Sequence, residues 1–166
     1  MDKELAVQSL TDTMAKFTAY IGKRLPKDVK SKLIELKTLE TNPLAKSIYD
    51  SMDENQEAAD RLNRPSCQDT GVIQYFVEAG AHFPLLGELQ EILREATEEA
   101  TRTGPLRHNA VETFDEKNTG TNTGTQIPWL DWRIVPEQDT CTIDVYMAGG
   151  GCTLPGAAKV LMPGQG

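Results

Sequence analysis

The apolar residues of the first sixty positions recur at alternating steps of three and four, the period of one face of an α-helix. We therefore expect three helices: one ending near Ile21, a second opening at Pro26, and a third opening at Asn42-Pro43, a good N-cap and first-turn pair. We assign their apolar faces to the core or to subunit contacts. These faces comprise Val7, Leu10, Met14, Phe17 and Ile21, then Val29, Leu33 and Leu36, then Leu44, Ile48, Met52, Asn55, Ala59 and Leu62.

From residue 64 onward the pattern changes to shorter elements of mixed type. Residues 72–77 are β-branched and aromatic and predict a strand, and residues 129–135 and 140–147 predict two more, joined by a turn at Pro136. In the last of these, Cys141 alternates with apolar residues and is assigned to the core. A fourth helix is marked by Leu86, Leu89, Leu93, Ala96 and Ala100, and a short helical piece with Leu106, Ala110, Val111 and Phe114 on its buried side follows Gly104-Pro105.

The predicted elements indicate an α+β fold. A helical part, residues 1–63, leads into a site-bearing part, residues 64–166, with a small and mixed β-sheet. A further apolar segment begins at residue 157 and stops at Pro163-Gly-Gln-Gly166 without closing a domain. We therefore expect the chain to be the N-terminal portion of a longer gene product; a natural short protein with a frayed tail is the alternative.

Composition narrows the class of protein. Apolar residues are 39% and charged residues 25% of 166, which suits one globular domain. The net charge of -8 argues against a nucleic-acid surface and means that an anionic ligand must be held by local cationic or N–H groups. The sequence has no apolar run long enough to cross a membrane and no signal-peptide h-region. Together with an odd number of cysteines, 3, this favours a reducing cytoplasm.

Two segments carry side chains that a folded core does not require. Cys67 stands in a polar turn before a buried strand, where a thiolate can act as a metal ligand or nucleophile. The alternative is an ordinary half-buried cysteine beside a turn built by Asp69. Arg107 can bind a carboxylate through two parallel N–H bonds, and its neighbour His108 can relay protons; a surface arginine and a helix-capping histidine are the alternatives. His82 is assigned to packing.

Three consecutive glycines, 149–151, follow the last predicted strand. Such a run frees the backbone to point N–H groups at an anion, although a simple tight turn is the alternative. No nucleotide-binding motif is present, since the run is not GxGxxG and no Lys-Ser or Lys-Thr follows it. The sequence also lacks CxxC, which argues against a self-contained metal site.

Four ordered segments resemble a known family. RPSCQDTG (64–71), FPLLGELQ (83–90), PLRHNAVETFDEKNTGTNTG (105–124) and IDVYMAGGGCTLPGAAKVLMP (143–163) are similar to the iron–sulfur hydro-lyases that include class I fumarases and L(+)-tartrate dehydratase alpha subunits. The resemblance covers most of the chain. It implies a [4Fe–4S] cluster held by three cysteines, whose open iron acts as a Lewis acid on the leaving hydroxyl.

The resemblance also implies roles for individual residues. Cys67 takes the place of the first cluster ligand, and Arg107 that of an arginine that binds a substrate carboxylate. The other residues implied to contact substrate are Gln68, Asp69, Gly149, Cys152 and Thr153. The remaining cluster cysteines and the catalytic base are expected beyond Gly166, partly on a beta subunit.

One departure from the family pattern narrows the expected substrate. Fumarases of this class carry Ser after the triple glycine and Lys soon after, whereas Cys152 to Pro155 stand here, which favours the tartrate dehydratase branch. We expect dehydration of L-tartrate to oxaloacetate, or of malate to fumarate, without nucleic-acid or membrane partners. The alternative is a non-catalytic module that binds a dicarboxylate or a partner subunit.

Overall fold

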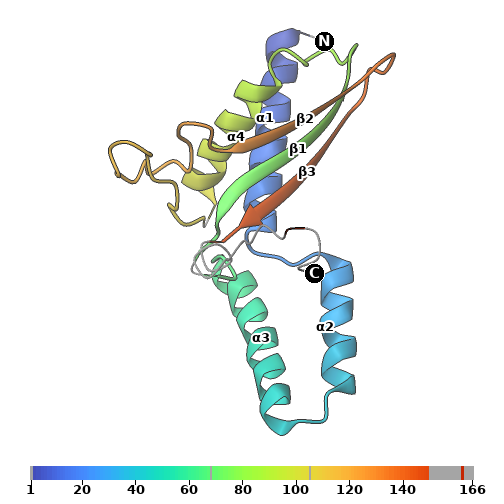
Figure 1. The fold of residues 1–166 in the computed structure, drawn as a ribbon, viewed down its shortest axis with the longest axis vertical. Helices are drawn as coiled ribbons and strands as arrows, with labels where there is room; N and C mark the ends of the chain where they lie inside the picture. Colours follow the sequence, from blue (N-terminus) through green and yellow to red (C-terminus); the bar gives the residue numbers. More distant parts are fainter. Residues whose placement is uncertain (1, 68, 105, 150–161, 163–166) are drawn as a thin grey trace.

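The computed structural model describes residues 2–67, 69–104, 106–149 and 162. Its elements in chain order are α1 (Lys3–Ile21), α2 (Lys27–Leu39), α3 (Pro43–Leu62), β1 (Val72–Gly80), α4 (Leu89–Thr103), β2 (Trp129–Val135) and β3 (Cys141–Ala148). Figure 1 shows α1 and α4 beside the sheet, with α2 and α3 extending away as a separate pair. The expected α+β class is confirmed. No helix in the described part is long and apolar enough to span a membrane.

The sheet has the order β2-β1-β3, so the strand that comes first in the sequence lies in the centre. β2 runs parallel to β1, and β3 runs antiparallel to it. The link between β2 and β3 crosses the end of β1, where the Gly80 N–H donates to the Thr140 carbonyl at 2.8 Å and the His82 N–H to the Gln138 carbonyl at 2.8 Å. The predicted turn around Pro136 therefore joins two strands that β1 separates.

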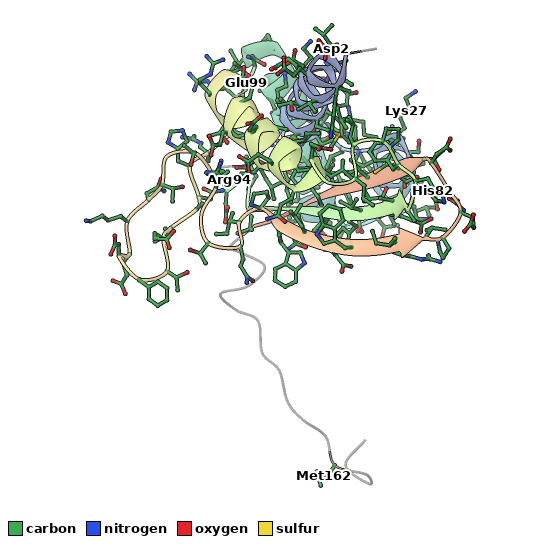
Figure 2. The ribbon with its side chains drawn as sticks, turned by 90° about the horizontal axis from the view of Figure 1, so that it is seen from above. Asp2, Lys27, His82, Arg94, Glu99 and Met162 are labelled. Carbon is green, nitrogen blue, oxygen red and sulfur yellow. The ribbon has the colours of Figure 1, made fainter. Side chains whose placement is uncertain are left out.

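One face of the sheet is packed by α1 and α4, as Figure 2 shows from above. β1 buries every second side chain against the helices because alternate residues of a strand point to the same face. α4 contributes apolar residues at helical spacing to the same layer. The buried core consists of Met14, Ala15, Ile73, Tyr75, Val77, Ala79, Leu89, Leu93, Ala96, Ala100 and Leu106.

Tyr75 on β1 joins the sheet to both helices of this core through its hydroxyl. The Tyr75 side chain is fully buried, and its Oη lies 3.0 Å from Thr18 Oγ1 on α1 and 3.0 Å from Thr97 Oγ1 on α4. Burial raises the pKa of Tyr75, since desolvation disfavours the phenolate. The neutral phenol therefore acts as a hydrogen-bonded tie between the sheet and both helices.

The opposite face of the sheet has no helix on it in the described part of the chain. Phe76, Trp129 and Tyr146 point to this face and are 41%, 50% and 56% exposed. They flank Gln74, which lies opposite both Trp129 and Tyr146 in the register. The open face is thus most aromatic near the end at which β1 begins.

The structure corrects the predicted burial of the first three helices. On α1 the buried residues are Thr11, Met14, Ala15 and Thr18, whereas Phe17 is 44% exposed. α2 has no buried residue, and α3 buries only Ala59. Of the two roles predicted for the α2 and α3 faces, the core of this chain is contradicted and subunit contact stays a prediction, because an apolar period indicates an amphipathic face and not what covers it.

Two smaller predictions were also wrong. The helical piece predicted after Gly104 is an irregular segment, in which Leu106 and Ala110 are buried while Phe114 is 87% exposed. His82 does not pack in the core: its imidazole is 65% exposed and lies 3.8 Å from Glu137.

α4 begins at Leu89, three residues after the first apolar residue assigned to it. Asn42 caps α3 as expected, since its side chain accepts from the Leu44 N–H at 2.9 Å.

Replacing Tyr75 by Phe should destabilise the fold by about 1–2 kcal/mol, because the buried threonine hydroxyls lose a partner while the ring remains. Urea unfolding followed by circular dichroism measures the change. Tyr146→Phe, on the open face, is the matched control and should shift the unfolding free energy by less than about 0.5 kcal/mol. Equal effects of the two substitutions would contradict the role given to the Tyr75 hydroxyl.

Candidate functional site

Three segments meet at the end of the sheet where β1 begins and β3 ends. Gly71 precedes β1 with φ +80°, and a Cβ on it would lie 2.2 Å from the carbonyl oxygen of Ala148. Only glycine permits both the left-handed conformation and this close approach. The backbone at Gly71 is therefore held directly against Ala148 and Gly149, where the triple glycine starts.

Asp69 lies at the centre of this junction. Its Oδ1 accepts from the Gly71 N–H at 2.8 Å, which closes a turn, and from Asn109 Nδ2 at 2.8 Å. A Cβ on Gly149 would lie 3.6 Å from Asp69 Oδ2, so Gly149 passes beside the same carboxylate. Asp69 and Gly149, two of the residues predicted to contact substrate, are thus brought together.

Thr70 ties the same segment to Arg107. The Arg107 N–H donates to Thr70 Oγ1 at 3.2 Å, and the Thr70 hydroxyl lies 3.4 Å from the Arg107 carbonyl oxygen, to which it donates. Thr70 is buried, whereas the Arg107 residue is exposed. The backbone of Arg107 is consequently fixed while its side chain stays accessible.

Asn122 holds the Arg107–Ala110 stretch from the other side. It is 3% exposed and left-handed, with φ 58°. Its Oδ1 accepts from the Asn109 N–H at 2.7 Å, and its Nδ2 donates to the Arg107 carbonyl at 2.7 Å and to Thr101 Oγ1 at 3.1 Å. The buried side-chain amide of Asn122 therefore links the irregular segment to α4 and fixes the path of the segment's backbone.

A cleft of about 610 Å³ opens at this junction. It offers a carboxylate, an imidazole, several amides and the indole ring of Trp129, which suits a small polar ligand. Its lining is Asp69, Gly71, Val72, Gln74, His108, Asn109, Val111, Asn118, Gln126, Ile127, Trp129 and Ala148. Within the described residues no carboxylate forms an ion pair with the Arg107 guanidinium, which lies outside this lining.

Cys67 is exposed and lines a different cleft, of about 530 Å³, between α2 and α3. Cys141 packs half-buried against the core, as predicted, and burial raises the pKa of its thiol, which disfavours a thiolate there.

Gln68, Cys152 and Thr153 lie outside the described residues. In the part that the structure describes, no group of three or more His, Cys, Asp or Glu side chains could hold a metal ion.

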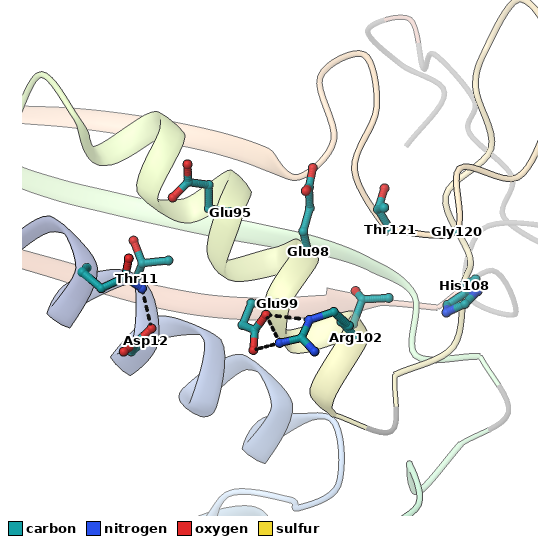
Figure 3. Close-up of a pocket in the computed structure, with 11 residues that line it drawn as sticks. Thr11, Asp12, Glu95, Glu98, Glu99, Arg102, His108, Gly120 and Thr121 are labelled. Carbon is teal, nitrogen blue, oxygen red and sulfur yellow. Dashed lines mark hydrogen bonds and ion pairs between the residues drawn. The ribbon is translucent and has the colours of Figure 1, made fainter.

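A larger cleft, of about 810 Å³, is lined by residues of α1 and α4 (Figure 3). His108 lines this cleft as well as the cleft beside Asp69. Its walls carry Asp12, Glu95, Glu98 and Glu99, and its one lining arginine, Arg102, is bonded to Glu99 at 2.7 Å. This acidic surface repels an anion. Charge rather than size therefore favours the smaller cleft beside Asp69 as the candidate site.

Sequence reasoning missed Thr70, Asn109 and Asn122. Asn122 stands in the NTGTNTGT segment, 118–125, whose content of Gly, Asn and Thr indicates a loop and nothing more specific. An asparagine among glycines and threonines is, however, also the residue that most readily adopts a left-handed conformation and bonds to backbone groups. That preference was the available signal.

Comparison with known proteins adds independent findings. The sequence model of the fumarate hydratase (Fumerase) family matches residues 11–166. L(+)-tartrate dehydratase subunit alpha from Escherichia coli (strain K12) is 58% identical over 165 residues, which is 99% of this chain and 54% of the relative. A putative L(+)-tartrate dehydratase subunit alpha from Methanocaldococcus jannaschii is 31% identical over 149 residues, 86% of this chain and 51% of the relative. The chain thus spans about half the length of the curated relatives it matches.

Gly71→Ala should destabilise the protein by about 2–4 kcal/mol, because it adds left-handed strain and a clash with the Ala148 carbonyl. Chemical denaturation measures the loss. Gly87→Ala is the matched control, since a Cβ there meets nothing within 4 Å, and it should be close to neutral. If Gly71→Ala unfolded at the same denaturant concentration as Gly87→Ala, the close crossing would not be a constraint.

Proposed function

We propose that this chain, which belongs to the fumarate hydratase family, forms part of a hydro-lyase acting on a small hydroxy dicarboxylate. L-Tartrate, converted to oxaloacetate with loss of water, is the proposed substrate, and malate, converted to fumarate, is the alternative. The observation that carries the proposal is the convergence of the 69–71, 107–109 and 148–149 segments beside the Asp69 carboxylate.

Arg107 is proposed to bind one carboxylate of the substrate. Its backbone is held by Thr70 and Asn122, while its guanidinium is exposed and, among the described residues, forms no ion pair. An arginine so fixed can bind a carboxylate through two parallel N–H bonds. In a chain with net charge -8, such a local cation is needed to hold an anion.

Asp69 and Gly149 are proposed to border the bound substrate, together with Gln68, Cys152 and Thr153. Asp69 is oriented by Asn109 and by the Gly71 N–H, so its carboxylate is held in place before a ligand arrives. Such preorganisation reduces the entropy lost on binding. His108 lines the same cleft and could accept or deliver a proton there.

An iron–sulfur cluster fits the described residues only in part. Cys67 offers one exposed thiol in a polar turn, and we propose it as one ligand of a [4Fe–4S] cluster. One thiolate cannot hold four irons, and no described group of three ligands exists. The other ligands, and the catalytic base, are therefore proposed to come from outside the described residues.

A beta subunit is the proposed partner, because the matched relatives are named as alpha subunits. We also propose a cytoplasmic location. Cys67 and Cys141 are free thiols, as expected in a reducing compartment, where an exposed cysteine persists unpaired.

Cys67→Ala in the full-length subunit, assembled with its beta partner under anaerobic conditions, should abolish tartrate dehydration and reduce bound iron from about four per subunit to near zero. The reason is that a cluster held by three thiolates is lost as a whole when one of these ligands is removed, and does not merely change its reduction potential. Iron and sulfide analysis and oxaloacetate formation measure the two effects. Cys141→Ala, which removes a thiol from the core face of β3, is the matched control and should retain its iron. Full turnover by Cys67→Ala would reject the ligand assignment.

Arg107→Lys should weaken tartrate binding by about tenfold or more, because the ammonium group keeps the charge but loses the bidentate geometry. Calorimetric titration of the 166-residue chain with tartrate measures the affinity. Arg133→Lys, at the far end of the sheet in a pair with Glu78, is the control and should bind like the unmodified chain.

A non-catalytic binding module is the second candidate. It is favoured by the absence of a three-ligand metal group among the described residues. Tartrate binding by a 166-residue chain that takes up no iron would support a module, whereas about four irons per chain would exclude it.

A further inference from the structure

The larger cleft, lined by residues of α1 and α4, has no role in the hydro-lyase proposed above. Its volume, about 810 Å³, falls in the range of small-molecule sites. It carries four carboxylates and one guanidinium, so its charge is opposite to that of a site for a dicarboxylate. Its charged lining residues are Asp12, Glu95, Glu98, Glu99 and Arg102.

Two of the four carboxylates are not neutralised within the chain. Glu98 and Glu99 form ion pairs with arginines of α4 at 3.0 and 2.7 Å. Asp12 of α1 and Glu95 of α4, by contrast, form no ion pair with any described residue. Figure 3 shows that these two side chains come from different helices. The cleft therefore presents one unpaired carboxylate from each of its two helices.

A buried hydroxyl without a partner belongs to the same cleft. Thr11 lines it and is 5% exposed, and its Oγ1 is the one buried side-chain polar atom of the described residues that has no hydrogen-bond partner. Thr13 of α1 and Thr101 of α4 instead donate to the carbonyl four residues earlier, at 2.7 and 2.8 Å. A buried hydroxyl left unpaired destabilises a fold, so the Thr11 hydroxyl points to a bound hydrogen-bonding group.

The available groups select an ammonium ion over a metal ion. Carboxylate and hydroxyl oxygens accept hydrogen bonds, and an ammonium group has three donors and no acceptor. In the part of the chain that the structure describes, no three His, Cys, Asp or Glu side chains converge as a metal ion requires. A flexible chain with an ammonium group at each end can instead reach carboxylates that stand on separate helices.

We propose that this cleft binds an aliphatic polyamine. One ammonium group is held by Asp12 and by the Thr11 hydroxyl, and another by Glu95 on the neighbouring helix. The chain's net charge of -8 attracts such a polycation at long range, and the local carboxylates then hold it. Thr11, Asp12 and Glu95 do not line the cleft beside Asp69, so the proposal is independent of the proposed hydro-lyase activity.

Calorimetric titration of the 166-residue chain with spermidine at low ionic strength tests the proposal. Hexaamminecobalt(III) carries the same charge in compact form and should bind about tenfold more weakly, because it cannot span the two helices. Asp12→Asn and Glu95→Gln should each weaken spermidine binding by about threefold or more. Glu54→Gln on α3 makes the same change in net charge away from the cleft, is the matched control, and should bind like the parent chain.

Thr11→Val tests the buried hydroxyl, since it keeps the shape of the side chain and removes the oxygen. It should weaken spermidine binding by about threefold. Without ligand it should melt at or above the parent temperature, because no hydrogen bond is lost, and circular dichroism measures this. Parent affinity in Thr11→Val, equal losses in Glu54→Gln and Glu95→Gln, or hexaamminecobalt(III) binding as tightly as spermidine would overturn the proposal.

Discussion

The crossing of the Gly71 backbone over Ala148 is the constraint from which the candidate site follows. β1 and β3 pair in antiparallel register, so the chain entering β1 and the chain leaving β3 must pass at the same end of the sheet. They pass within ordinary contact distance only because residue 71 has no side chain. That approach sets Asp69 beside Gly149, and the hydrogen bonds of Asn109 and Thr70 then bring the Arg107 segment to the same point.

Buried amides and hydroxyls, not apolar packing, hold the irregular part of this site. Asn122 satisfies four polar partners from a nearly fully buried position, and Thr70 bridges both backbone groups of Arg107. Such groups are costly to bury unless they are paired, so their arrangement is strongly specified. The Arg107 backbone is thus held by hydrogen bonds on both its N–H and its carbonyl, while its side chain stays exposed.

The sequence predicted most of the regular structure because period and capping are local properties. β2 was predicted at its observed bounds, and Asn42 and Pro26 marked helix starts correctly. The helix predicted over residues 106–114 does not form. Leu106 and Ala110 have helical spacing, but Asn122, which follows Ala110 by twelve residues, holds this segment in an irregular conformation through its side-chain amide. Local patterns also showed that Asp69, Arg107 and the glycines were unusual, but not that Asn109 and Thr70 join them, since those contacts span 37 to 40 residues.

The strand order has a consequence for biogenesis. β1 is complete by residue 80, but both of its neighbours come more than 48 residues later, at 129–135 and 141–148. During synthesis on the ribosome, both hydrogen-bonding edges of β1 therefore stay unpaired until residues 129–148 have emerged. Arrest of synthesis before β3 would leave an apolar strand exposed to chaperones, and the end of the sheet that carries the candidate site cannot assemble before β3 has been made.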